Sequence, residues 1–326
     1  MSEITPGRYA AIDIGTVTCR MYVADVDEEG RLHEVDREYA ITNLGEGVDD
    51  ARELQPQAIE RVAAAIEGFL AVLRLLPGAK GITTRVFAVA TSAARDARNS
   101  DLLIKRLHEM GVGLQVIPGW REASLSFAGA ASAFGDESLV VVDVGGGSTE
   151  FTAGGAGTPS VGTPSTSPKL ISRSFDVGCR RVTERFLHSD PPSDSELADA
   201  RKWVAAQILP YRALLADAGR QVGRMVAVAG TATSIVSVRE RMEVYQTQLV
   251  HLSVVTREQL DEQFEWMAKL PLEQRRQIVG LDPDRAPVVL GGLMILQEAM
   301  TLLGVDEFTV SESDILQGIV MDESRS

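Results

Sequence analysis

One pattern occurs twice in this chain and constrains its fold more than any other feature. An apolar segment beginning at Tyr9 ends in the tetrapeptide DIGT at residues 13–16, and a second apolar segment follows. A longer apolar run from Leu139 ends in DVGGGSTE at residues 143–150. Each copy predicts a buried strand, a tight turn rich in glycine and hydroxyl side chains, and a returning strand. The copies lie about a domain's length apart, so we interpret them as a duplicated α/β unit.

Strand and helix patterns alternate along the rest of the chain. Helical spacing predicts helices over residues 55–76, 101–110, 121–134, 178–187 and 193–218, the last with a capping box of Ser193 and Glu196 and a possible kink at Pro210. Strands are expected at 84–91, 114–117, 169–175, 225–229 and 308–310, and a final helix from about residue 311. Residues 152–168, which carry no charge, are predicted to form a hairpin loop. This alternation favours α/β layering.

Composition excludes several classes of protein. The 326 residues suggest about two domains, and a net charge of −14 argues against nucleic acid as a partner. No segment is apolar enough to span a membrane, the start MSEITPGRY lacks a signal peptide's apolar core, and two cysteines make no disulfide framework. We therefore expect a cytoplasmic protein without a membrane partner. The motifs of a P-loop, a zinc protease and a serine-hydrolase elbow are absent from the sequence.

The glycine-rich turns predict anion binding. A turn of this kind directly after a buried strand exposes successive backbone N–H groups, which together can hold a phosphate. The candidate phosphate-binding residues are Gly15, Thr16 and Thr18, then Gly145, Gly146, Gly147, Ser148 and Thr149, then Gly230, Thr231, Ala232 and Thr233. A single turn would more often be ordinary hairpin chemistry, but the repetition favours function.

Carboxylates flank the first two turns. Asp13 and Asp143 lie where their strands end, and Glu150 follows Asp143 by seven residues on the returning strand. One or two carboxylates together with phosphate oxygens suffice to hold Mg²⁺, so these three residues are candidate metal ligands. The alternative interpretation is turn capping for the aspartates and a solvated surface position for Glu150.

Six segments together resemble the exopolyphosphatase / guanosine pentaphosphate phosphohydrolase family, which belongs to the actin-like superfamily. The segments are DIGT at 13–16, TSAARD at 91–96, IPGWREA at 117–123, VDVGGGSTE at 142–150, VGCRRVTER at 177–185 and AGTAT at 229–233. The resemblance implies two actin-like (ribonuclease H-like) α/β domains, residues 1–121 and 122–311, with mixed sheets flanked by helices and a cleft between them. It also implies that the last helix, about 312–326, packs back on the first domain.

The same resemblance implies roles for particular residues. Glu122 would be the catalytic acid or base, Asp143 and Glu150 would hold Mg²⁺ and position the attacking water, and Arg95 and Arg285 would contact phosphate. Three positions depart from the family pattern. Val17 replaces an asparagine, Arg121 replaces the first glutamate of an E-E-A segment, and Pro287 stands where an acidic residue is common.

The expected activity is release of orthophosphate from the end of inorganic polyphosphate by Mg²⁺-dependent, in-line attack of water. Guanosine pentaphosphate hydrolysis and a non-catalytic phosphate or nucleotide sensor remain as alternatives, and a homodimer stays open. A cluster of arginines (Arg173, Arg180, Arg181 and Arg185) suggests a cationic track for a long phosphate chain. Ordinary surface ion pairs with Asp176 and Glu184 are the competing interpretation of this cluster.

Overall fold

The chain forms two compact units that are each built around one mixed β-sheet. The computed structural model describes residues 4–77, 83–155 and 170–325. Within these residues the first unit runs to Gly129 and is completed by the segment from Ile315 onward, and the second unit runs from Ala130 to Asp314. Residues 156–169, most of the predicted hairpin loop, lie outside the described residues.

The sheet of the first unit has five strands. They are β1 (Gly7–Ile14), β2 (Thr18–Val26), β3 (Leu32–Ile41), β4 (Thr84–Ala90) and β5 (Leu114–Val116), in the spatial order β3-β2-β1-β4-β5. β1, β2 and β3 form an antiparallel meander, and β4 and β5 run parallel to β1. The sequence patterns had not indicated β3, whose residues are mostly half-buried and polar.

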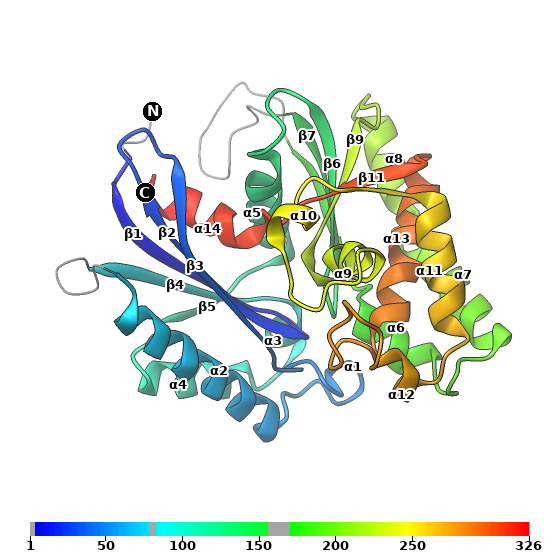
Figure 1. Cartoon of the computed structure of the whole chain (residues 1–326), viewed down its shortest axis with the longest axis horizontal. Helices are drawn as coiled ribbons and strands as arrows, with labels where there is room; N and C mark the ends of the chain where they lie inside the picture. Colours follow the sequence, from blue (N-terminus) through cyan, green and yellow to red (C-terminus); the bar gives the residue numbers. More distant parts are fainter. Residues whose placement is uncertain (1–3, 78–82, 156–169, 326) are drawn as a thin grey trace. The chain divides into compact units, whose positions relative to one another are not determined.

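Side chains on β1 alternate between the two faces of this sheet. Ile12 and Ile14 belong to the apolar core formed with α2 (Pro56–Leu75) and α4 (Ser100–Glu109). Tyr9 and Ala11 belong to the core formed with α5 (Gly119–Ala131) and α14 (Ile315–Glu323). Figure 1 shows α2 and α4 on one side of the sheet and α14 on the other. By the same alternation, Asp13 shares its face with the α5 and α14 side.

The sheet of the second unit repeats this plan with one strand added. Its strands are β6 (Ser138–Val144), β7 (Thr149–Gly155), β8 (Ile171–Phe175), β9 (Arg224–Val228), β10 (Val254–Thr256) and β11 (Glu307–Val310). Their order is β8-β7-β6-β9-β11-β10, and the first five have the same relative directions as β3-β2-β1-β4-β5. The predicted duplication is confirmed, and β10 is an added edge strand paired antiparallel to β11.

Helices cover the second sheet. They are α6 (Cys179–Phe186), α7 (Asp194–Ile208), α8 (Pro210–Asp217), α9 (Ala229–Arg239), α10 (Thr247–Val250), α11 (Arg257–Ala268), α12 (Leu272–Arg275) and α13 (Val289–Leu303). α6, α7, α11 and α13 lie together on one side of the sheet (Figure 1). The capping box of Ser193 and Glu196 is present at the start of α7. The helix predicted over 193–218 is interrupted at Leu209, because Pro210 has no N–H to donate and opens α8 instead.

Two short helices complete the first unit, α1 (Val48–Ala51) and α3 (Ser92–Asp96). The helix expected from about residue 311 begins later, at Ile315. Among the described residues, no helix is both long and apolar enough to cross a bilayer.

Candidate active site

The first two glycine-containing turns are built alike. In the first unit the N–H of Gly15 donates to the carbonyl of Thr18 at 2.9 Å, and in the second the N–H of Gly145 donates to the carbonyl of Ser148 at 3.0 Å. Each turn therefore closes a hairpin, β1–β2 in one unit and β6–β7 in the other. The duplication extends from the topology of the sheets to the hydrogen bonding of these turns.

In the first turn, later segments of the chain hold the carbonyl groups. The carbonyl of Thr16 accepts from Gly45 N–H at 2.8 Å, and that of Val17 accepts from the N–H groups of residues 42 and 43, both at 2.9 Å. In a planar trans peptide the N–H points opposite to the C=O. Anchoring these carbonyls therefore directs the N–H groups of Val17 and Thr18 to the other side of the turn.

The second turn is held by the start of α6. The carbonyls of Gly145, Gly146 and Gly147 accept hydrogen bonds of 2.9 Å from Cys179 N–H, Arg180 N–H and the Nε of Arg181, respectively. Peptide planarity then directs three consecutive N–H groups, those of Gly146, Gly147 and Ser148, away from α6. Three such groups in succession form an anion-binding nest.

Gly178 allows α6 to approach this turn. A Cβ at position 178 would lie 2.2 Å from the carbonyl oxygen of Gly146, which is far inside van der Waals contact. The φ of Gly178 is −132°, a value open to any residue, so the requirement is close approach rather than backbone conformation. The next residue, Cys179, is buried, and burial raises the pKa of its thiol, which disfavours a nucleophilic thiolate.

The third turn follows β9 and is organised around Arg285. Its Nη1 donates to the carbonyl of Gly230 at 2.6 Å and to Ser234 Oγ at 3.1 Å. A Cβ on Gly230 would lie 2.3 Å from the guanidinium carbon of Arg285, so a larger residue here would displace this guanidinium from its present position. The predicted residues Thr231, Ala232 and Thr233 lie in the first turns of α9. The structure brings Arg285 to the predicted turn as a group that binds its backbone.

Asp143 and Glu150 lie directly opposite each other on β6 and β7. Both are buried, with exposed fractions of 8% and 2%, and Ser174 Oγ donates to Glu150 Oε1 at 2.6 Å. Two buried carboxylates in a cross-strand pair repel one another, so a cation between them is favoured. One or two carboxylates together with phosphate oxygens and water suffice to hold Mg²⁺, so the pair fits that cation.

The equivalent pair in the first unit has a different charge. Asp13 lies opposite Arg20, whose Nη2 donates to Asp13 Oδ2 at 2.7 Å. An aspartate already paired with an arginine has less need of a metal ion than a pair of carboxylates. A metal-binding role for Asp13 stays a prediction.

Glu122 and Arg95 form an ion pair within the first unit. Arg95, on α3, donates through Nη1 to Glu122 Oε2 at 3.0 Å and to the carbonyl of Ile117 at 3.1 Å. Glu122 lies in the first turn of α5 and is mostly buried. Glu122, assigned as the base by resemblance, and Arg95, assigned to phosphate contact, are thus neighbours, and the ion pair orients the carboxyl group.

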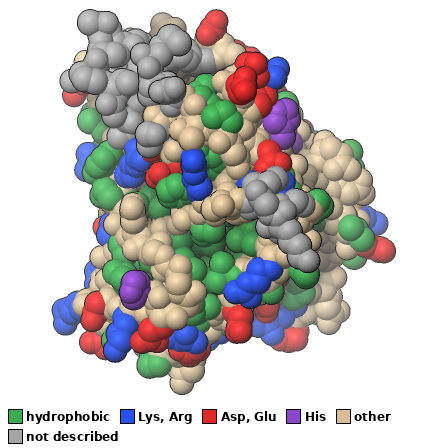
Figure 2. Space-filling view, turned by 90° about the vertical axis from the view of Figure 1, so that its left-hand side faces the viewer, with side chains coloured by type: hydrophobic (Ala, Val, Ile, Leu, Met, Phe, Trp, Pro, Cys, Tyr) green, Lys and Arg blue, Asp and Glu red, His purple; other side chains and the backbone are tan. Residues whose placement is uncertain are grey.

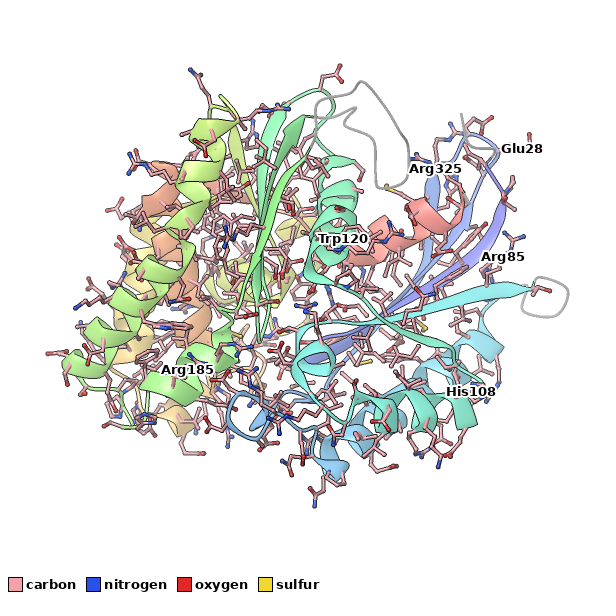
Figure 3. The ribbon with its side chains drawn as sticks, turned by 180° about the vertical axis from the view of Figure 1, so that it is seen from behind. Glu28, Arg85, His108, Trp120, Arg185 and Arg325 are labelled. Carbon is pink, nitrogen blue, oxygen red and sulfur yellow. The ribbon has the colours of Figure 1, made fainter. Side chains whose placement is uncertain are left out.

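The structure describes the surroundings of all three residues that depart from the family pattern. Val17 contributes its backbone carbonyl, which accepts the hydrogen bonds that anchor the first turn. Arg121 forms an ion pair with Asp322, which joins α5 to α14 across 201 positions of sequence. Pro287 lies in the turn that precedes α13. The neighbour of Arg121, Trp120, is 58% exposed at the start of α5 (Figure 3).

The predicted cationic track is wrong for one of its members. Arg181 is only 5% exposed and therefore cannot lie on an open surface. Arg180 Nη1 bonds Glu184 Oε1 at 3.1 Å, which is the ion pairing considered as the alternative. Arg185, labelled in Figure 3, places its guanidinium 5.2 Å from the centre of the Trp203 ring. On the face shown in Figure 2, acidic and basic side chains are interspersed rather than gathered by sign.

Comparison with known proteins assigns the chain to a class of phosphatases. It belongs to the Ppx/GppA phosphatase family, whose model matches residues 22–326. It is 36% identical to exopolyphosphatase 2 of Mycobacterium tuberculosis over 330 residues, covering 96% of this chain and 98% of that protein. It is 32% identical to a bifunctional 3-dehydroquinate synthase/phosphatase of Fusobacterium nucleatum, covering 96% of this chain and 46% of that protein.

Two solved structures support the same assignment. The crystal structure of an exopolyphosphatase-like protein superposes with a TM-score of 0.85 at 31% identity and covers 98% of both chains. The Ppx/GppA family member of Aquifex aeolicus superposes with a TM-score of 0.75 at 26% identity, covering 98% of this chain and 97% of that one. The predicted family and the predicted duplicated α/β fold are confirmed.

Proposed function

We propose that this protein is an exopolyphosphatase that releases orthophosphate from the end of inorganic polyphosphate. The observation that carries the proposal is the combination, in the second unit, of three co-directed backbone N–H groups with the buried Asp143–Glu150 pair. This combination suits a phosphoanhydride, whose oxygens accept hydrogen bonds and attract a divalent cation. The similarity to exopolyphosphatase 2 over nearly the whole of both chains supports the substrate class.

The reaction is a hydrolysis in which Glu122 acts as the base. The water oxygen forms a bond to the terminal phosphorus, the bridging P–O bond breaks, and the shortened chain leaves with the bonding electron pair. The proton lost by the water passes to the carboxylate of Glu122. Arg95, which holds Glu122 in the structure, is a cation within reach of the same carboxylate and can also bind a phosphate oxygen.

The second unit supplies charge stabilisation in this proposal. The N–H groups of Gly146, Gly147 and Ser148 donate to non-bridging phosphate oxygens. Asp143 and Glu150 would hold Mg²⁺, which when bound neutralises part of the phosphate charge. Because phosphoryl transfer needs little covalent help, positioning and charge account for most of the expected rate enhancement.

One side-by-side assay tests the proposal. Purified protein is given long-chain polyphosphate, tripolyphosphate or guanosine pentaphosphate over a Mg²⁺ titration, and released orthophosphate and remaining chain length are measured. The expected result is Mg²⁺-dependent orthophosphate release from polyphosphate, with chains shortened from the end. Glu122→Gln serves as the control for contaminating phosphatases.

The other outcomes contradict the proposal in distinct ways. Release from guanosine pentaphosphate alone would establish a pentaphosphate phosphohydrolase. Binding of polyphosphate without release, at every Mg²⁺ concentration, would establish a sensor of the same fold.

A further inference from the structure

Arg181 is a buried cation that lies behind the glycine turn of the second unit. It occupies the first turn of α6 and is 5% exposed. Its Nε donates to the carbonyl of Gly147 at 2.9 Å, and its backbone N–H approaches the carbonyl of Gly146 at 3.3 Å. Burying a guanidinium is costly unless it is paired or hydrogen-bonded, and the bond from Nε to the Gly147 carbonyl is one interaction that compensates for its burial here.

The Gly147–Ser148 peptide depends on this side chain. Backbone N–H groups of α6 hold the two preceding peptides of the turn, through the carbonyls of Gly145 and Gly146. The carbonyl of Gly147 is instead held by the Nε of Arg181. In the first unit, the corresponding turn has its carbonyls held by backbone N–H groups from residues 42, 43 and 45. A substitution at position 181 can therefore release one peptide while the others stay anchored.

We propose that Arg181 is a positioning residue for phosphate binding, a role that rests on the exopolyphosphatase function proposed above. Its bond to Gly147 fixes the orientation of the next N–H, that of Ser148, toward the phosphate. The guanidinium charge lies at the carbonyl end of the same peptide. It therefore adds positive potential at the Ser148 N–H, although the side chain does not contact the substrate. Arg181 thus acts through the turn rather than as a surface contact for the chain.

Kinetics give the first test. Arg181→Met keeps length and apolar volume but removes the donor and the charge, and Arg181→Lys restores the charge with a less well-placed donor. Arg181→Met leaves the Ser148 N–H in place but frees its orientation. Because a misplacement of about 1 Å can cost about 10²-fold in rate, we expect kcat/KM on polyphosphate to fall by about 10²-fold in Arg181→Met. Arg181→Lys should recover part of the loss. The matched control, Arg212→Met at an exposed position of α8 in the same unit, should stay within about two-fold of wild type.

Amide NMR gives a second readout that does not need turnover. Methylenediphosphonate, which the enzyme cannot hydrolyse, is titrated into the isotope-labelled full chain. In the wild type the amide signals of Gly146, Gly147 and Ser148 should all shift. In Arg181→Met the first two should still shift, and the Ser148 signal should respond much less.

The outcomes separate this proposal from the proposed function. An equal Ser148 response in wild type and Arg181→Met, or unchanged kcat/KM in that variant, would overturn the role of Arg181. A wild type whose three amides ignore the probe would overturn it as well. If the wild type releases no orthophosphate, the exopolyphosphatase proposal fails, yet the titration still decides how the turn is positioned. If Arg181→Met does not fold, the same titration on Arg181→Lys must give a reduced Ser148 shift.

Discussion

Replacing Glu150 with glutamine should stabilise the protein in the absence of metal. The side chains of Asp143 and Glu150 are direct cross-strand partners, and both are buried. Such partners have Cβ atoms about 5 Å apart. If the carboxylates are separated by a similar distance, two like charges in an effective dielectric constant of about 20 repel by roughly 3 kcal/mol. In the unfolded chain both carboxylates are separated and solvated, so this repulsion lowers the stability of the metal-free fold.

Glu150→Gln removes the repulsion with little change in shape. Ser174 Oγ donates to Glu150 Oε1, and a glutamine oxygen can accept the same hydrogen bond. After side-chain relaxation we expect a gain of about 1–3 kcal/mol in the free energy of unfolding. For a domain of about 150–250 residues this corresponds to a rise in Tm of roughly 2–12 °C.

Thermal melts in EDTA and in Mg²⁺ measure how the carboxylate repulsion and the binding of Mg²⁺ each change the stability of the fold. In EDTA the variant should melt above the wild type. Added Mg²⁺ should raise the Tm of the wild type, because a ligand that binds only the folded state stabilises it, and should raise that of the variant much less. Phosphate release by the variant should need a higher Mg²⁺ concentration, since a neutral amide is a poorer ligand for a hard cation.

A control on the same unit isolates the effect of the carboxylate pair. Glu262→Gln makes the identical chemical change at an exposed position of α11 and should leave the Tm in EDTA almost unchanged. A Glu150→Gln variant that melts at or below the wild type in EDTA would refute the argument that these carboxylates repel each other in the metal-free protein.

Three further changes test other parts of the site. Glu122→Gln should lower turnover by about 10²-fold or more while polyphosphate binding persists, because the base is lost and the shape kept; near-normal turnover would remove Glu122 from the reaction. Arg121→Ala and Asp322→Ala should each cost about 1–3 kcal/mol in unfolding free energy, and a double-mutant cycle should show coupling; additive losses would mean that the ion pair contributes nothing. Gly178→Ala should lower kcat/KM strongly, because the new Cβ would force α6 away from Gly146, and wild-type kinetics would contradict the close packing.

The hairpin geometry made part of the site predictable. A tight turn fixes the register of its two strands, so residues seven apart, such as Asp143 and Glu150, become direct partners. The same spacing in the first copy relates Asp13 to Arg20, a pairing that the sequence analysis did not draw. Applied to both copies, this reasoning would have shown from sequence that only the second pair carries two negative charges.

Other features depended on tertiary packing and left little signal in the sequence. Arg181 and Arg185 are four residues apart on a helix, so their spacing in the sequence predicts that they share one helical face. Which of them is buried depends on how α6 docks against the glycine turn, through the close approach at Gly178. The partner of Arg121 is far away in the chain and lies on α14, so no local pattern could identify it.

The return of the chain from the second unit to the first has a consequence for biosynthesis. The sheet of the first unit buries Tyr9 and Tyr22 against apolar residues of α14, such as Ile315 and Ile319. On the ribosome, β1 and β2 emerge first, and α14 emerges only after the entire second unit. At about 5–20 residues per second, this interval lasts roughly ten seconds or more. During that time the tyrosine-bearing face of the nascent first unit lacks α14, and transiently exposed apolar surface of this kind is prone to aggregation.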